Sequence, residues 1–207
     1  MPTFSALPTR RANYSNITQH NYAANHGNTG YVPGDGVTAY DKPVDYSGIK
    51  YGGAPFLSTG IVDEGTATTK YPAKQVKAKE IPDGLSKTIM FAEMVPGVTI
   101  GGDLRAMAWW GPGSMVMTYL GPNSLQPDVS QSSSYCTNDD KDLPCSPNSM
   151  SSTLPMTFAS RSRHPSGVHV SLCDGSVHFA SDEVSMNVWQ AMGTTRGGEV
   201  ASSEELK

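Results

Sequence analysis

The stretch Ser162–Phe179 constrains the fold of this chain more than any other. Two runs in which apolar and polar residues alternate, 168–173 and 176–179, flank the pair Asp174-Gly175. An Asp-Gly pair between two alternating runs is typical of a β-hairpin, because both central residues of a type I′ turn need positive φ. The sequence therefore predicts a hairpin that turns at Asp174-Gly175.

A turn at these two residues determines which strand positions face each other. Cys173 would face Ser176, and Leu172 would face Val177. One face of the hairpin is then wholly apolar and consists of Val168, Val170, Leu172, Val177 and Phe179. The other face carries His169, Ser171, Cys173, Ser176 and His178. Because a slip of one residue would exchange the two faces, we expect burial of the apolar face to hold this register.

The remainder of the chain predicts short elements separated by many turns. Its 207 residues include 21 Gly and 15 Pro, which interrupt nearly every apolar run. Strand candidates lie at 56–62, at 88–94 and, as two fragments, within 105–117. A short helix is expected to open at 181–183 and to end at Gly193. Its apolar stripe would be Val184, Val188, Trp189 and Met192.

We therefore expect an α+β fold dominated by antiparallel strands. One domain would span 1–200, with a long surface loop at 119–155 and irregular structure before residue 50. Residues 201–207 form a polar tail that we expect to be frayed.

Charge and motif content argue against several functional classes. The net charge is −4 and no block of Lys or Arg occurs, so nucleic acid is not an expected partner. No run of about 20 apolar residues is present, so we expect no membrane span within this sequence. The usual hydrolase, nucleotide-binding and metalloprotease motifs are absent, and we expect no enzyme activity. A hydrolase built on Glu93 and Asp103 would need a fold that brings the two carboxylates together, which their spacing does not indicate.

Two of the three cysteines bracket a short polar loop. Cys136 and Cys145 enclose TNDDKDLP, a segment with little to hold it unless its ends are tied. We expect a disulfide between them, which would indicate an oxidising compartment; two free surface thiols are the alternative. Cys173 is left over as a small, half-buried residue.

Several side chains are candidates for ligand binding. His169 and His178, with Cys173 close by, could hold Zn²⁺ or Cu²⁺ in the expected register, although polar residues on the less buried face of a sheet are the simpler interpretation. The loop residues Asn138, Asp139, Asp140 and Asp142 offer the oxygen ligands that Ca²⁺ prefers, or are merely solvated. Trp109 and Trp110 would point to opposite faces of a strand, so that one of them could stack on a sugar or simply pack under a loop.

Two polar residues next to the expected strands have less specific roles. His164 precedes Pro165 and so lies in an extended segment, where we expect it to hydrogen-bond the adjoining loop or Asp174. Glu93 ends the strand candidate 88–94, and we expect it to accept hydrogen bonds from a loop.

The hairpin also carries a recognisable signature. His164, nine intervening residues and then Asp174-Gly175 resemble the signature of the prepilin-type processing-associated H-x9-DG proteins, a large bacterial family of unknown biochemical role. Further stretches resemble motifs of that family in the same order: 8–11, 21–27, 81–88 with Glu93, 121–124 with 127–128, and 189–194 with 197–200. The resemblance spans nearly the whole chain, and the joint order is far more specific than any single motif.

The resemblance implies a pilin-like or type II secretion pseudopilin-like protein of the cell envelope or the extracellular space. In the family, a cleaved leader and a long hydrophobic helix precede a β-rich globular part, and only that globular part is matched here. The family's early cysteine is also replaced, since Ala6 or Leu7 stands near its place. The implied partners are other pilin-like subunits or envelope proteins, with a monomer expected in solution because the polymerising helix is missing. An extracellular module that binds glycan or calcium is the alternative.

Overall fold

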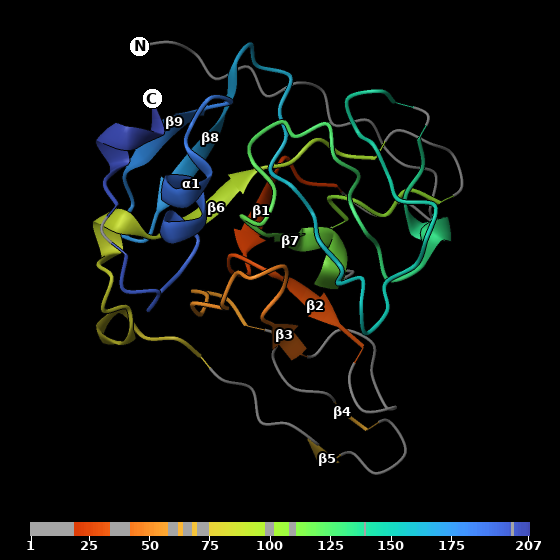
Figure 1. The fold of residues 1–207 in the computed structure, drawn as a ribbon, viewed down its shortest axis with the longest axis horizontal. Coiled ribbons are helices and arrows are strands. Elements are labelled where there is room, and N and C mark those ends of the chain that lie inside the picture. Colours follow the sequence, from red (N-terminus) through yellow and green to blue (C-terminus); the bar gives the residue numbers. More distant parts are fainter. Residues whose placement is uncertain are drawn as a thin grey trace.

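The structure, a computed structural model, describes residues 19–33, 42–57, 62–63, 68–69, 75–97, 102–107, 111–138, 140–199 and 201–207 (Figure 1). A five-stranded sheet has the order β7-β1-β6-β8-β9. These strands are β7 (Met115–Val116), β1 (Tyr22–Asn25), β6 (Ile89–Glu93), β8 (Gly167–Leu172) and β9 (Val177–Ser181). All neighbours in the sheet are antiparallel except β1 and β7, which are parallel.

The other elements are small. Two two-stranded sheets pair β2 (Gly30–Val32) with β3 (Lys42–Val44), and β4 (Val62–Asp63) with β5 (Thr68–Thr69). The α-helix α1 spans Met186–Met192. Short 3₁₀ helices are η1 (Ala78–Glu80), η2 (Leu85–Lys87), η3 (Gly111–Ser114), η4 (Ser133–Tyr135) and η5 (Ser203–Leu206). The expected α+β class is confirmed, with a mixed central sheet, and none of the helices in the described residues is long and apolar enough to cross a bilayer.

One face of the central sheet, here called the inner face, packs against α1 to form the core. Alternate residues of β8, from Val168 to Leu172, lie on this face and are fully buried. Trp189 and Met192 of α1 belong to the same buried cluster. The Trp189 indole N–H donates to the carbonyl of Leu120 over 2.8 Å, which satisfies the ring's polar atom inside the core.

The helix begins later than the sequence indicated. Ser185 is its N-cap and its hydroxyl accepts the N–H of Val188, whereas Ser181 accepts the N–H of Glu183 in a separate turn. The expected start at 181–183 was therefore wrong, because a turn precedes the cap. The expected end at Gly193 is confirmed, as is burial of Val184, Trp189 and Met192.

The hairpin is confirmed, but its register differs by one residue. Val170 faces His178, and His169 faces Phe179. The turn is formed by three residues, Cys173–Gly175: the N–H of Gly175 donates to Leu172 (3.0 Å), and the N–H of Leu172 donates to Ser176 (2.9 Å). Gly175 has φ +88°, as a type I turn followed by a bulge requires.

The longer turn puts the side chains of β9 on the face opposite to the expected one. Val177 and Phe179 leave the core face and are 61% and 39% exposed, while Ala180 takes the inner position beside Val168. The N–H groups of Cys173 and Asp174 bond the carbonyls of Thr88 and Leu85, so the turn is held by the segment before β6. These hydrogen bonds to a distant segment favour the three-residue turn over the two-residue turn. The Asp-Gly pair alone does not distinguish the two.

Other expectations for the fold had mixed outcomes. The strand at 88–94 is confirmed as β6. Of the strand expected at 56–62, Phe56 lies in a bend, Leu57 is irregular, 58–61 lie outside the described residues and Val62 begins β4. Within 105–117, Met107 forms an isolated bridge and β7 is the other fragment. The segment 119–155 is loop-rich as expected, yet Val129 and Leu143 are buried. Most of this segment, green to cyan in Figure 1, lies on the side of the sheet away from the β8–β9 hairpin.

The C-terminal residues differ from the expected frayed tail. Ala201 and Leu206 are buried in the main core cluster, and η5 contacts both β9 and α1. The polar residues of this segment are concentrated on η5, where Glu205 accepts the N–H of Ser202 in a capping box. This segment is polar in composition, but its two apolar side chains, Ala201 and Leu206, anchor it to the core.

A buried histidine next to β1 makes stability depend on pH. His26 is 7% exposed, and its ring lies edge-on to Tyr31 with centroids 6.0 Å apart. Burial lowers the pKa of His26 to about 4, from an ordinary value of 6.5. Between these two pH values the unfolded chain binds more protons than the folded one, so the free energy of unfolding falls as the pH falls.

We expect this histidine to account for about 3 kcal/mol of the stability lost between neutral pH and about pH 4. Urea unfolding of the wild type and His26→Gln at both pH values measures it, because glutamine does not titrate. The variant should lose less stability on acidification than the wild type. Equal losses in the two proteins would contradict the assignment.

Candidate functional site

The face of the sheet away from α1, here called the outer face, gathers polar and aromatic side chains. Across four strands, Tyr22 of β1 is paired with Glu93 of β6, and His169 of β8 is paired with Phe179 of β9. The β6–β8 register places Glu93 beside His169. Because directly opposed residues point to the same side of a sheet, these four side chains form one row. Glu93 is thus held by the sheet itself between an aromatic residue and a histidine.

Glu93 is the centre of this cluster. Its Oε1 lies 3.1 Å from His164 Nε2, and its Oε2 lies 3.3 Å from His169 Nδ1. The backbone N–H of His169 also donates to Oε2 over 2.7 Å. The Glu93 side chain is 11% exposed, against 46% for His164 and 23% for His169. The Glu93 carboxylate is therefore mostly buried, and the two more exposed imidazoles lie between it and the solvent.

Aromatic contacts orient the imidazoles. The ring of His169 lies edge-on between His164 and Phe179, with centroid separations of 4.8 and 5.1 Å. Tyr22 stands on the other side of Glu93, and burial together with the Glu93 charge raises the pKa of its hydroxyl. The expectation that Glu93 accepts hydrogen bonds is confirmed, although one donor comes from a strand.

Two imidazole nitrogens and a carboxylate are a donor set that divalent transition metals accept. Among the described residues, Glu93, His164 and His169 each offer one ligand atom, and these atoms lie within 4.8 Å of one another. The cluster is thus suited to bind a metal ion at the surface of the sheet.

The other histidine site predicted from the sequence is not formed. The register places His178 on the inner side, opposite Val170, while His169 points outward. Burial and the neighbouring Asp174 charge raise the pKa of the Cys173 thiol to about 11, so this residue does not supply a thiolate at neutral pH. The proposed His169–His178–Cys173 grouping was therefore wrong, because it depended on the two-residue turn.

The signature residues His164 and Asp174 lie at opposite ends of β8 and do not bond each other. His164 lies before the strand and Asp174 lies in the turn after it. The His164 N–H bonds the nearby Ser162 hydroxyl, as expected of a contact with the adjoining loop, but its ring bonds Glu93 and not Asp174. The Asp174 carboxylate accepts the hydroxyl and the N–H of Ser176, and these bonds lower the pKa of Asp174. Asp174 therefore shapes the turn, and His164 belongs to the outer face.

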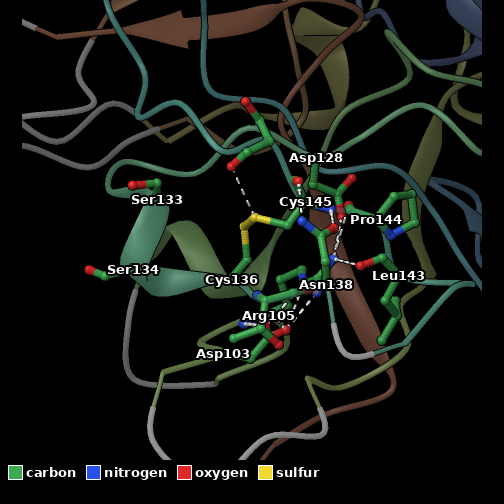
Figure 2. The surroundings of a disulfide bond; sticks show 12 residues. Asp103, Arg105, Asp128, Ser133, Ser134, Cys136, Asn138, Leu143, Pro144 and Cys145 are labelled. Atoms are coloured by element: carbon green, nitrogen blue, oxygen red, sulfur yellow. Dashed lines mark hydrogen bonds and ion pairs between the residues drawn. A yellow bond between two sulfur atoms is a disulfide. The ribbon is translucent and has the colours of Figure 1, made fainter.

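A second polar cluster is deeply buried beside a disulfide (Figure 2). The predicted Cys136–Cys145 bond is confirmed, with Cα atoms 5.9 Å apart. Asn138 also ties the loop, since its side chain donates to the Cys145 carbonyl (2.8 Å) and accepts the Cys145 N–H (2.5 Å). Cys173 is the free cysteine and is half-buried, as expected.

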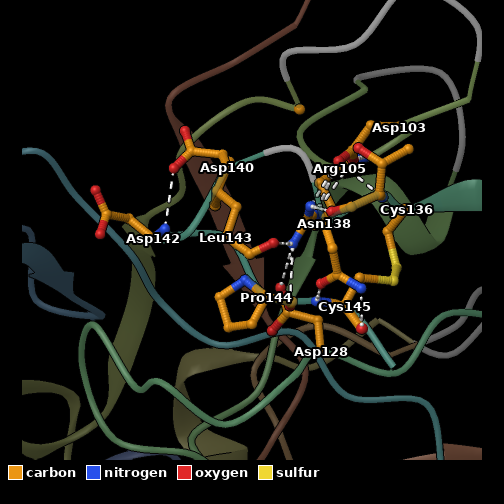
Figure 3. A network of polar contacts seen from close by, with 12 residues as sticks. Asp103, Arg105, Asp128, Cys136, Asn138, Asp140, Asp142, Leu143, Pro144 and Cys145 are labelled. Atoms are coloured by element: carbon orange, nitrogen blue, oxygen red, sulfur yellow. Dashed lines mark hydrogen bonds and ion pairs between the residues drawn. A yellow bond between two sulfur atoms is a disulfide. The ribbon is translucent and has the colours of Figure 1, made fainter. Parts of the chain in front are cut away.

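Next to the disulfide, Arg105 lies between two aspartates (Figure 3). Its guanidinium contacts Asp103 Oδ2 at 2.5 Å and Asp128 Oδ2 at 3.0 Å. Asp128 Oδ1 in turn accepts Arg161 at 2.9 Å. All four side chains are no more than 2% exposed, and their charges cancel. The cluster is a closed structural network, and Asp103 is held by Arg105 rather than placed as a catalytic partner for Glu93.

The acidic loop proposed for calcium has other partners. Asp140 and Asp142 both pair with Arg163, and the Asn138 side chain is used by the Cys145 backbone. Burial alone would raise the pKa of Asp140, but the hydrogen bond from Arg163 and the N–H of Asp142 lower it. These oxygens therefore already have internal donors. Asp139, like Trp109 and Trp110, lies outside the described residues.

We expect the disulfide to contribute about 2 to 3 kcal/mol, because it closes a short loop with a sequence separation of 9. Urea unfolding of a Cys136→Ala/Cys145→Ala variant should show this loss. Cys173→Ala is the matched control and should change stability much less, since Cys173 closes no loop. A double variant as stable as the control would contradict this expectation and would mean that the polar contacts of Asn138, Arg105 and Arg163 hold the loop without the disulfide.

Comparison with known proteins gives one result. A family model described as "Protein of unknown function (DUF1559)" matches residues 1–187. The chain belongs to this family. Neither the curated proteins nor the solved structures contain a significant match to this DUF1559 chain.

Sequence reasoning quoted Glu93 and His164 separately but did not bring them together. The available signal was that both occupy motif positions in the family resemblance, about 70 residues apart. Of the buried ions, Asp128 also lies at a motif position, 127–128, whereas Arg105 and Arg161 gave no such signal. Only the fold shows that these charges are enclosed.

Proposed function

We propose that this DUF1559 chain is a non-enzymatic structural protein, the globular head of a pilin-like or type II secretion pseudopilin-like assembly in the cell envelope or outside the cell. Two facts support this proposal. The signature His164, Asp174 and Gly175 occurs in the family's order with the other motifs, and the Cys136–Cys145 disulfide suits an oxidising compartment.

The observation that carries the proposal is the character of β9. It is an edge strand of the central sheet, and it exposes two large apolar side chains, Val177 and Phe179, on the outer face. An apolar edge strand favours contact with another chain unless it is covered. In a pilin-like assembly a neighbouring subunit would cover it.

Photo-crosslinking in the bacterium that encodes the chain tests the proposal. A photoreactive phenylalanine derivative is placed at Val177 and, as the matched control, at Leu125, which is 79% exposed in the loop after β7 and belongs to no strand. We expect a crosslink from position 177 to a second copy or to another pilin-like subunit, identified by mass spectrometry. Position 125 should give much less of this product.

Two results would overturn the proposal. One is the absence of any subunit crosslink from position 177 when the protein is present and folded. The other is equal crosslinking from both positions, because that would indicate random collision rather than an interface.

A further inference from the structure

We propose that Glu93, His164 and His169 form a binding site for one divalent transition-metal ion, with Zn²⁺ as the best-suited ion. The site lies on the outer face, where β6 supplies the carboxylate, β8 supplies one imidazole and the loop before β8 supplies the other. It lies next to the subunit contact proposed above, because Phe179 packs against His169, but zinc binding by the isolated chain does not depend on that contact.

The distances are close to those of a zinc site. Zinc binds histidine nitrogen at about 2.0–2.1 Å and carboxylate oxygen at about 2.0–2.2 Å, so tetrahedral ligand atoms lie roughly 3.3–3.5 Å apart. Glu93 Oε1 lies 3.1 Å from His164 Nε2 and Glu93 Oε2 lies 3.3 Å from His169 Nδ1, so each histidine nitrogen is already at about this spacing from one of the two carboxylate oxygens. The three ligand atoms lie within 4.8 Å of one another, so any two of them need to approach by at most about 1.5 Å to reach that spacing. His164 is the most exposed of the three, so its side chain has the most freedom to adjust to an ion.

The donor chemistry selects the class of ion. Two imidazoles and one carboxylate are the protein ligands of many zinc sites that keep an open position, and they also suit ferrous iron. Calcium prefers a shell of oxygen atoms, which these residues do not offer. The exposure of His164 leaves solvent access for a water molecule as a further ligand.

The charge of Glu93 supports a cation at this place. Its carboxylate is mostly buried, and the ion pairs recorded for it in the described part of the chain are with His164 and His169 alone. By contrast, each buried aspartate of the Arg105 network has a permanently charged guanidinium. A metal ion would supply a permanent positive charge beside this carboxylate.

The site is also oriented before an ion arrives. The His169 N–H fixes Oε2 of Glu93, and the edge-on contacts with Phe179 and His164 fix the plane of the His169 ring. Such outer contacts matter in metal sites, because loss of one typically lowers metal affinity by about 10- to 100-fold.

Calorimetric titration of the EDTA-treated full chain with zinc tests the proposal. We expect one zinc ion per chain and a higher melting temperature in its presence. His164→Asn should weaken the affinity by at least about tenfold, because it removes a ligand rather than an outer contact. The side chain is exposed, so this variant should fold, which circular dichroism checks.

His178→Asn is the matched control, since His178 lies on the same hairpin but points to the other face. It should bind zinc as the wild type does. Zinc affinity that is unchanged in His164→Asn would overturn the proposal. So would a wild-type protein that shows no heat of zinc binding and no rise in melting temperature with zinc. Cobalt gives an independent readout, because its visible absorption should report imidazole and carboxylate ligands in the wild type and change in the His164 variant.

Discussion

Replacing Arg105 with methionine should lower the free energy of unfolding by about 3–5 kcal/mol. Arg105 is 1% exposed, and its guanidinium bonds Asp103, Asp128 and three backbone carbonyls. Burial alone would lower the pKa of Arg105, but the hydrogen bond and charge of Asp103, with the charge of Asp128, raise it. Methionine fills much of the volume and leaves a buried carboxylate without its cation.

Arg163→Met is the matched control, because Arg163 also joins two aspartates but is 34% exposed. Pairs of that kind contribute about 0–1 kcal/mol. Urea unfolding of both variants gives the comparison. A similarly small loss of unfolding free energy in both variants would contradict this expectation. It would mean that water reaches the Arg105 network and screens its ion pairs.

Trp189→Ala should cost about 3–5 kcal/mol, because it empties the centre of the core between α1 and the sheet. The side chain is fully buried and its N–H bonds Leu120. Trp189→Phe keeps most of the volume and should cost about 1–3 kcal/mol, since the Leu120 carbonyl would lose a buried donor.

Asn187 lies on the exposed side of the same helix, so Asn187→Ala is the control for helix propensity. It should change stability by no more than about 0.5 kcal/mol. Thermal and urea unfolding of the three variants measure these differences. A Trp189→Ala variant as stable as Asn187→Ala would show that α1 does not complete the core.

The β8–β9 hairpin shows how far sequence reasoning reaches. Alternation predicted both strands, and it predicted the inner face of β8 correctly. It failed for β9, because Asp-Gly fits a two-residue turn and a three-residue turn equally well. The structure gives a reason for the choice: the N–H groups of Cys173 and Asp174 bond the carbonyls of Thr88 and Leu85. Those bonds join segments that are far apart in the chain, so a local pattern does not contain them.

The candidate site was even less accessible from the sequence. Glu93 meets His164 and His169 only because β6 and β8 are neighbours, and neither spacing nor composition specifies that pairing. The disulfide was predictable because its cysteines are close in the chain. Contacts between distant segments depend on the whole fold, so resemblance to a family was the only sequence signal that included both Glu93 and His164.

Anomalous diffraction from crystals of the chain grown with zinc is the most direct test of the proposed metal site. We expect a zinc peak on the outer face, about 2.0–2.2 Å from His164 Nε2, His169 Nδ1 and a carboxylate oxygen of Glu93. A map with no peak there, or with zinc only at the Asp140–Asp142 loop, would contradict the assignment of this cluster as the functional site.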